Sequence, residues 1–136
     1  MIAQLSPNTS SSSGGTRNRV LVVDDSPSFR KMVRHVLSEG GYEVVEAADA
    51  KQAMAAVEHT HFDLVLTDHN LPGTDGLMLI RSLRGTTRCA KVPILMLTTE
   101  SSGEMKAAGR AAGATGWMVK PFDPHRLLAL VHQVVR

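Results

Sequence analysis

The sequence lacks the features that would cross-link the chain by disulfides, anchor it in a membrane or direct its export. Of its 136 residues only one is cysteine, Cys89, so no disulfide can form within the chain and a reducing compartment is expected. No apolar run approaches the roughly 20 residues that span a bilayer. The opening MIAQLSPNTS does not have the basic-then-apolar order of a secretory signal. We therefore expect a cytoplasmic protein with no membrane partner.

Basic residues are too few and too dispersed to predict a nucleic-acid surface. The formal net charge is +2, and Lys and Arg do not gather into a stripe, so no nucleic-acid partner is expected. A nucleotide-binding loop is disfavoured as well, because no glycine-rich segment follows the first apolar run. With 43% hydrophobic and 21% charged residues, the composition is that of a globular domain.

The chain divides into a polar segment and one domain. Residues 1–17 are mostly small and polar, and include the run SSSSGG. Such a segment cannot bury enough apolar surface to offset the entropy lost on ordering, so a disordered N-terminal tail is predicted there. Residues 18–136 are long enough for a single domain with its own core.

Within this domain, short apolar runs alternate with helical patterns. The apolar runs predict strands at 19–24, 42–47, 63–68, 92–97 and 114–119. Capping residues and helical spacing predict helices from 27 to about 39, over 50–59, 76–84 and 103–112, and from 124 onward, with 69–75 as a turn-rich loop. Strict alternation of buried strands and helices predicts an α/β fold with a parallel sheet covered on both faces.

Side chains able to do chemistry stand at the ends of four of these strands. The first strand ends in Asp24 and Asp25, the third in Asp68, the fourth in Thr98 and the fifth in Lys120. Taken singly, each is read more plainly as a cap, turn or surface residue. Together they are expected to converge, because open parallel sheets bind ligands at the carboxyl ends of their strands. Clustered carboxylates repel one another unless a hard cation such as Mg²⁺ joins them, and a carboxylate in such a site can accept a phosphoryl group.

The same segments carry a family resemblance. VLVVDDSPSFRKMV, DLVLTDHNLPGTDGL, PILMLTTES and GATGWMVKPF follow one another along the chain. They resemble the conserved blocks of CheY-like receiver domains of bacterial two-component systems, and the resemblance covers about residues 19–136. It implies a flavodoxin-like, doubly wound (βα)5 fold whose five-stranded parallel sheet has the order 2-1-3-4-5.

The resemblance also implies a role for each of these side chains. Asp24 and Asp25 would be the acidic pair for Mg²⁺ or Mn²⁺, and Asp68 would be both a metal ligand and the phospho-acceptor. The backbone carbonyl of Asn70 would be a further metal ligand, and Thr98 and Lys120 would contact the phosphoryl group. Thr98 and Trp117 would form a switch, and Asn70 and Glu100 would modulate the lifetime of the phosphorylated state. The Lys120–Pro121 bond would be cis. The family usually has Tyr or Phe at the switch position, so Trp117 is a departure.

The function implied by this resemblance is that of a stand-alone, single-domain response regulator. A histidine kinase or phosphotransfer domain would phosphorylate Asp68. The chain would then signal through a conformational switch to a protein partner on the face made by the fourth helix, the fifth strand and the fifth helix. It would not be an enzyme, beyond promoting its own phosphorylation and dephosphorylation. Asn70 and Glu100 resemble the residues of fast-decaying chemotaxis receivers, which favours a short-lived signal.

Other functions remain open on the sequence alone. A phosphorelay intermediate that passes the phosphoryl group on would carry the same residues. A phosphatase with an aspartate nucleophile is disfavoured, because the second Asp it needs as general acid is replaced by Asn70. A receiver that only binds a partner is disfavoured too, since such modules usually lack an acidic residue, the Lys or the acceptor.

Overall fold

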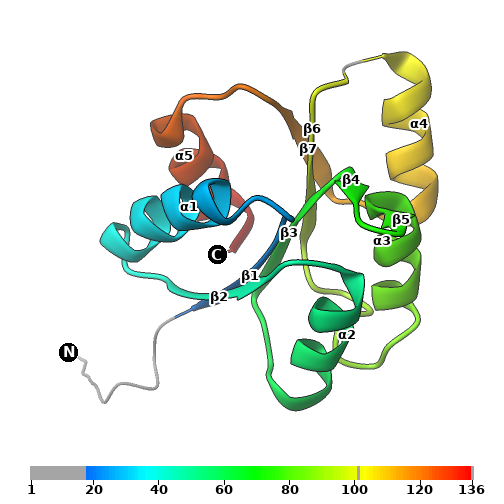
Figure 1. The fold of residues 1–136 in the computed structure, drawn as a ribbon, viewed down its shortest axis with the longest axis horizontal. Coiled ribbons are helices and arrows are strands. Elements are labelled where there is room, and N and C mark those ends of the chain that lie inside the picture. The colour runs from blue at the N-terminus through cyan, green and yellow to red at the C-terminus, as the bar shows by residue number, and fades with distance from the viewer. Residues whose placement is uncertain (1–17, 101, 136) are drawn as a thin grey trace.

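A five-stranded parallel sheet forms the centre of the computed structural model, which describes residues 18–100 and 102–135. Its strands are β1 (Arg19–Val23), β2 (Glu43–Ala47), β3 (Leu64–Asp68), β6 (Ile94–Thr98) and β7 (Gly116–Val119). They lie in the order β2-β1-β3-β6-β7 (Figure 1), which confirms the predicted order 2-1-3-4-5. The tail predicted over residues 1–17 lies outside the described residues.

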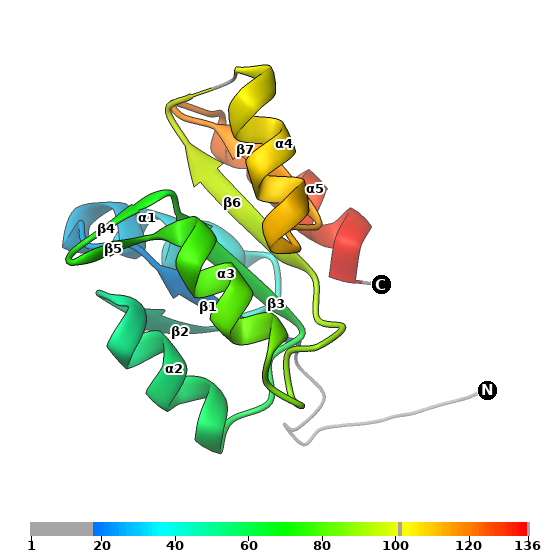
Figure 2. The same ribbon diagram turned by 90° about the vertical axis from the view of Figure 1, so that its right-hand side faces the viewer.

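In the described part of the chain, five helices cover the sheet. They are α1 (Pro27–Glu39), α2 (Ala50–His59), α3 (Gly76–Arg84), α4 (Gly103–Ala112) and α5 (Pro124–Val135). α1 and α5 lie on one face, and α2, α3 and α4 lie on the other (Figure 1 and Figure 2), which confirms the doubly wound α/β class. None of these helices in the described part of the chain has both the length and the hydropathy needed to cross a bilayer.

Successive strand residues enter two separate hydrophobic cores. In β1, Leu21 and Val23 pack toward α2, α3 and α4, whereas Val20 and Val22 pack toward α1 and α5. All of them are fully buried, which is why the strand is a continuous apolar run. Full burial of such a side chain stabilises the fold by about 1.5–3 kcal/mol, so the sheet is a firm support for the residues that follow its strands.

Capping side chains begin the helices close to the predicted positions. The Ser26 hydroxyl accepts a hydrogen bond from the N–H of the third residue of α1, and Asp49 does the same for α2. Asp75 and Ser102 cap α3 and α4 in the same way. Each cap satisfies a backbone donor that the helix leaves unpaired, and the helix bounds 50–59, 76–84 and 103–112 are confirmed.

The loop predicted over residues 69–75 contains a small antiparallel pairing. β4 (Asn70–Leu71) pairs with β5 (Thr74–Asp75) across Pro72 and Gly73, and Gly73 has φ +74°. Arms this short show no alternating pattern in the sequence, so the pairing could not be predicted. The last two long strands also begin later than predicted, because Pro93 has no N–H for the ladder and Thr115 uses its hydroxyl to accept from the Ile94 N–H.

The parallel register brings the strand ends to one edge of the sheet. Asp24 and Asp68 each follow directly after a register pair of β1 and β3. Lys120 follows directly after the β7 partner of Thr98. The candidate residues therefore emerge side by side, because neighbouring parallel strands end at the same edge.

Gly76 generates a test of how tightly the loop after β3 is packed. A Cβ at Gly76 would overlap with the carbonyl oxygen of Asp68 and lie 3.1 Å from the Cα of His69. These are backbone atoms that cannot rotate away, so Gly76→Ala is expected to lower the free energy of unfolding by about 1–3 kcal/mol. Urea denaturation measures it. Gly103→Ala is the control, because a Cβ there meets nothing within 4 Å. If both variants are as stable as the original chain, the packing described here is wrong.

Candidate functional site

Asp24, Asp25 and Asp68 form an acidic cluster at the carboxyl edge of the sheet. One carboxylate oxygen from each lies within 4.8 Å of the other two. Asp24 and Asp68 are buried, with exposed fractions of 1% and 9%, whereas Asp25 is exposed. Carboxylates this close repel one another, and burial of two of them strengthens the repulsion. The cluster is therefore short of positive charge.

Lys120 supplies a cation to this cluster. Its Nζ donates to Oδ2 of Asp24 at 2.9 Å and to Oδ1 of Asp68 at 3.3 Å. The ammonium also lies 4.1 Å from the centroid of the Phe29 ring, a cation–π contact. One ammonium group cannot neutralise three carboxylates, so the site retains an excess of negative charge. The Lys120–Pro121 bond is cis, which confirms that expectation.

The pKa of Asp68 reflects these opposing influences. Burial of the carboxyl group raises the pKa above its ordinary value, and the charge of Asp24 raises it further. Lys120 acts in the other direction, through its charge and its hydrogen bond, and the Asn70 backbone N–H also lowers the pKa. The increase prevails. Asp68 therefore gains more from a nearby cation than an exposed carboxylate would.

Thr98, Asn70 and Glu100 lie at or just beyond the carboxyl ends of β3 and β6, and their predicted roles stay predictions. Thr98 is buried at the end of β6, and its Oγ1 accepts a hydrogen bond from the Glu100 N–H at 3.0 Å. Among residues 18–100 and 102–135 the Thr98 hydroxyl donates no side-chain hydrogen bond, although a hydroxyl can donate as well as accept. Asn70 and Glu100 have exposed side chains at the rim of the site.

Trp117 lies on β7, away from the carboxylates. The indole is partly buried against the core shared by α3 and α4. Two cations of α4 lie over its ring, Lys106 at 5.6 Å and Arg110 at 5.7 Å from the centroid. The structure thus places the predicted switch residue beside a helix whose cations contact it. Whether Trp117 moves stays a prediction.

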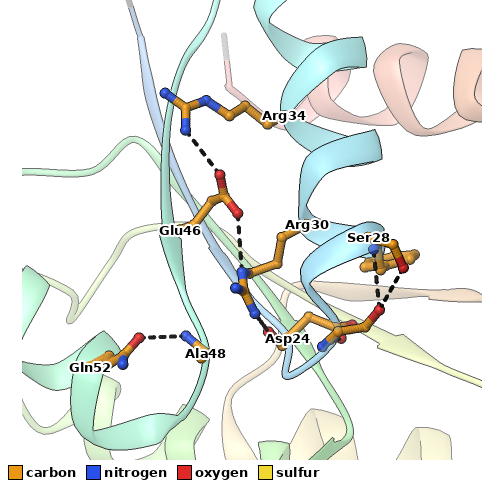
Figure 3. A network of polar contacts seen from close by, with 9 residues as sticks. Asp24, Ser28, Arg30, Arg34, Glu46, Ala48 and Gln52 are labelled. Atoms are coloured by element: carbon orange, nitrogen blue, oxygen red, sulfur yellow. Dashed lines mark hydrogen bonds and ion pairs between the residues drawn. The ribbon is translucent and has the colours of Figure 1, made fainter.

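Two residues of this site were missed by sequence reasoning. The helical spacing of Phe29 indicates only the apolar face of α1, and the structure shows its ring beside the Lys120 ammonium. Arg30 gave no signal, because an arginine on a helix is usually exposed. In the structure its guanidinium donates to the carbonyl oxygen of Asp24 at 2.6 Å (Figure 3). Neither contact follows from helical spacing, because spacing indicates a face of α1 and not the atoms which that face meets.

The chain matches a family model over most of its length. The model described as the response regulator receiver domain matches residues 20–132. Among solved structures, the chemotaxis response regulator CheY4 of Vibrio cholerae is 46% identical, with a TM-score of 0.84. That match covers 88% of this chain and 99% of CheY4.

Curated relatives include longer proteins. The phosphate regulon transcriptional regulatory protein PhoB of Pseudomonas aeruginosa is 38% identical over 117 residues, which are 86% of this chain and 51% of PhoB. The DNA-binding response regulator MtrA of Mycolicibacterium smegmatis is 39% identical over 120 residues, or 88% of this chain and 51% of MtrA. The chain thus spans about half the length of these relatives. Its expected stand-alone character stays a prediction.

These relatives correct one expectation. The exclusion of a nucleic-acid partner was wrong, because receivers similar to this chain occur in transcriptional and DNA-binding regulators. The exclusion rested on the charge of this domain, which does not report on a DNA-binding surface carried by another part of a protein. The model match, the fold and the acidic edge agree with one another, and the chain belongs to the response regulator receiver domain family.

Proposed function

We propose that Asp68 accepts a phosphoryl group from a histidine kinase or phosphotransfer domain, with a divalent cation bound beside it. The main support is the cluster of three carboxylates at the carboxyl edge of the sheet, two of which contact the Lys120 ammonium. Membership of the receiver family supports the same function. The chain is then a phospho-acceptor that promotes its own phosphorylation, and not an enzyme that acts on a separate substrate.

The residues present fit Mg²⁺ or Mn²⁺. Asp24, Asp25 and Asp68 offer the carboxylate oxygens that these hard cations prefer, and the exposed position of Asp25 leaves one side open for the waters that Mg²⁺ retains. The Asn70 backbone carbonyl is a further proposed ligand. When bound, the ion supplies positive charge that offsets the carboxylates and orients phosphoryl oxygens.

In the proposed reaction, a carboxylate oxygen of Asp68 attacks the phosphorus atom of a phosphohistidine. The new O–P bond forms as the P–N bond breaks, and the donor histidine keeps the electron pair of that bond. The Lys120 ammonium already lies 3.3 Å from Asp68, so it can follow the charge onto the phosphoryl oxygens. The Thr98 hydroxyl, which accepts from the Glu100 N–H, can donate its proton to one of them. The chain mainly provides orientation and charge, as phosphoryl transfer requires.

The comparisons support two kinds of output. Higher identity to CheY4, together with Asn70 and Glu100 at the rim, favours a short-lived chemotaxis-type signal that a protein partner reads. PhoB and MtrA favour the control of DNA binding by another part of a longer protein. We propose the first output, since the identity to CheY4 is 46%, against 38% and 39% for the other two.

The first prediction of this proposal concerns the acceptor. Incubation with acetyl phosphate and Mg²⁺ is expected to add one phosphoryl group to the chain, because acetyl phosphate is a small acyl donor that needs no protein partner. Asp68→Asn is expected to lose most of the labelling, since an amide oxygen is a poor nucleophile. Intact-protein mass spectrometry measures both. Asp75→Asn is the control, because Asn also caps a helix well and Asp75 lies outside the cluster. Equal labelling of all three proteins would refute the assignment.

The second prediction concerns pH and metal together. The pKa of Asp68 is higher in the folded chain than in the unfolded chain, so the ionised carboxylate destabilises the fold. This cost is absent below the unfolded pKa of about 4 and grows as pH rises through the folded value. In chelator, Asp68→Asn is therefore expected to melt at a higher temperature than the original chain at pH 7, with no difference near pH 3.

Mg²⁺ is expected to reverse that order at pH 7. At about tenfold excess over its dissociation constant it should stabilise the original chain by about 1.4 kcal/mol, and Asp68→Asn by less. Melting curves followed by circular dichroism give the melting temperatures of both proteins at pH 7, each in chelator and in Mg²⁺. A melting temperature of the original chain that does not respond to millimolar Mg²⁺ would contradict the proposed metal site.

The third prediction concerns the switch. Trp117 is the only tryptophan in the sequence, so fluorescence reports on one position. Beryllium fluoride, which has been used to activate the DrrB receiver domain, should mimic the phosphoryl group on Asp68. We expect it to change Trp117 emission or iodide quenching, because Thr98 moves toward the group and vacates space for the indole. Thr98→Ala should abolish the change. If Mg²⁺ with beryllium fluoride gives the same emission and quenching as Mg²⁺ alone, Trp117 is only a packing residue.

A further inference from the structure

Arg30 connects the acidic edge of the sheet to the neighbouring strand β2. It lies in the first turns of α1, and its side chain is only 15% exposed. Its Nη1 donates to the carbonyl oxygen of Asp24 at 2.6 Å, and its Nε donates to Oε1 of Glu46 at 3.1 Å. Figure 3 shows the guanidinium between these two partners, with Arg34 on the other side of Glu46.

The carbonyl that Arg30 holds belongs to the peptide between the two adjacent aspartates. The other polar groups of Asp24 also have partners. Its N–H donates to the Ala47 carbonyl at 3.1 Å, Oδ1 accepts from the Ser26 N–H at 2.9 Å, and Oδ2 accepts from Lys120. The first of the two aspartates is thus fixed at every polar atom.

Asp25 is in the opposite situation. It is exposed, and its carboxylate has no hydrogen-bond or ion-pair partner among residues 18–100 and 102–135. The backbone therefore sets only where this side chain starts, and the carboxylate itself can take several staggered rotamers. Because a peptide unit is planar, holding the Asp24 carbonyl also fixes the direction in which the chain continues to the Cα of Asp25.

We propose that Arg30 is a positioning residue of the metal site. By holding the Asp24 carbonyl, it fixes the peptide plane from which Asp25 leaves and so aims that carboxylate at the ion. This inference rests on the proposed Mg²⁺ or Mn²⁺ site. Glu46 holds the other side of the guanidinium, because its Oε1 accepts from Nε of Arg30 at 3.1 Å.

A purely structural role would predict something different. In that case Arg30 would only tie α1 to β2, as Arg34 does through its 3.0 Å ion pair with the same Glu46. Arg34 is more exposed and donates to Glu46 without contacting Asp24. Arg34→Gln is therefore a matched control that removes an ion pair to Glu46 and leaves the contact to the Asp24 carbonyl intact.

The test measures Mn²⁺ binding directly, by the electron paramagnetic resonance signal of free Mn²⁺, without any phosphoryl donor. Arg30→Gln is expected to raise the Mn²⁺ dissociation constant about tenfold, as removal of a group that orients a metal ligand commonly does. Arg30→Lys keeps the charge but not the fork that reaches both partners, so an intermediate value is expected. Arg34→Gln is expected to match the original chain within about twofold, since exposed ion pairs contribute little.

Melting in chelator separates stability from metal affinity. Arg30→Gln and Arg34→Gln each lose an ion pair to Glu46, so both can lower the melting temperature. Mn²⁺ binding is therefore measured at a temperature where each variant is folded, which excludes unfolding as the cause of weaker binding. If Arg30→Gln does not fold, Arg30→Lys carries the test. Unchanged or tighter Mn²⁺ binding by the Arg30 variants would overturn the inference, and so would equal weakening in Arg34→Gln. If the original chain binds no Mn²⁺, the proposed metal site itself fails, which is a separate result.

Discussion

The parallel register of β1 and β3 forces Asp24 and Asp68 together, and the resulting repulsion is the constraint on which the site depends. A buried pair of like charges destabilises a fold unless cations compensate it. Lys120 compensates in part, at 2.9 Å and 3.3 Å from the two carboxylates. The negative charge that Lys120 leaves uncompensated makes the site compatible with a divalent cation. The strands that carry these residues are buried on both faces, so the structure cannot relax by moving the carboxylates apart.

The two cations near the cluster, Lys120 and Arg30, contact different groups of it. Lys120 contacts the carboxylates and lies close enough to follow negative charge in the proposed transfer. Arg30 contacts only backbone at the site, and Glu46 holds it there. In the proposed function, Lys120 responds to the phosphoryl group while Arg30 holds the turn after β1. The Phe29 ring lies against the ammonium of Lys120 and limits its access to water.

Much of the fold could be predicted from the sequence, because its signals are local. Apolar runs and caps such as Ser26 and Asp49 marked the strands and helices, and strand ends indicated which polar residues meet. The contact of Phe29 with Lys120 could not be predicted, since it joins segments far apart in the chain. The contacts of Arg30 are nearer in the chain, but they depend on how α1 lies against β1 and β2, which the helical spacing of α1 does not indicate. The β4–β5 pairing has arms too short for a pattern. The charge of one domain also said nothing of the DNA-binding proteins in which similar receivers occur.

The most direct test of the central claim locates the phosphoryl group chemically. After incubation with acetyl phosphate and Mg²⁺, an aspartyl phosphate can be reduced with borohydride, which converts that aspartate to homoserine. Peptide mapping by tandem mass spectrometry then identifies the converted position. Homoserine is expected at position 68, with unmodified aspartate at positions 24 and 25. Conversion at another position, or no conversion when Mg²⁺ is bound, would show that Asp68 is not the acceptor.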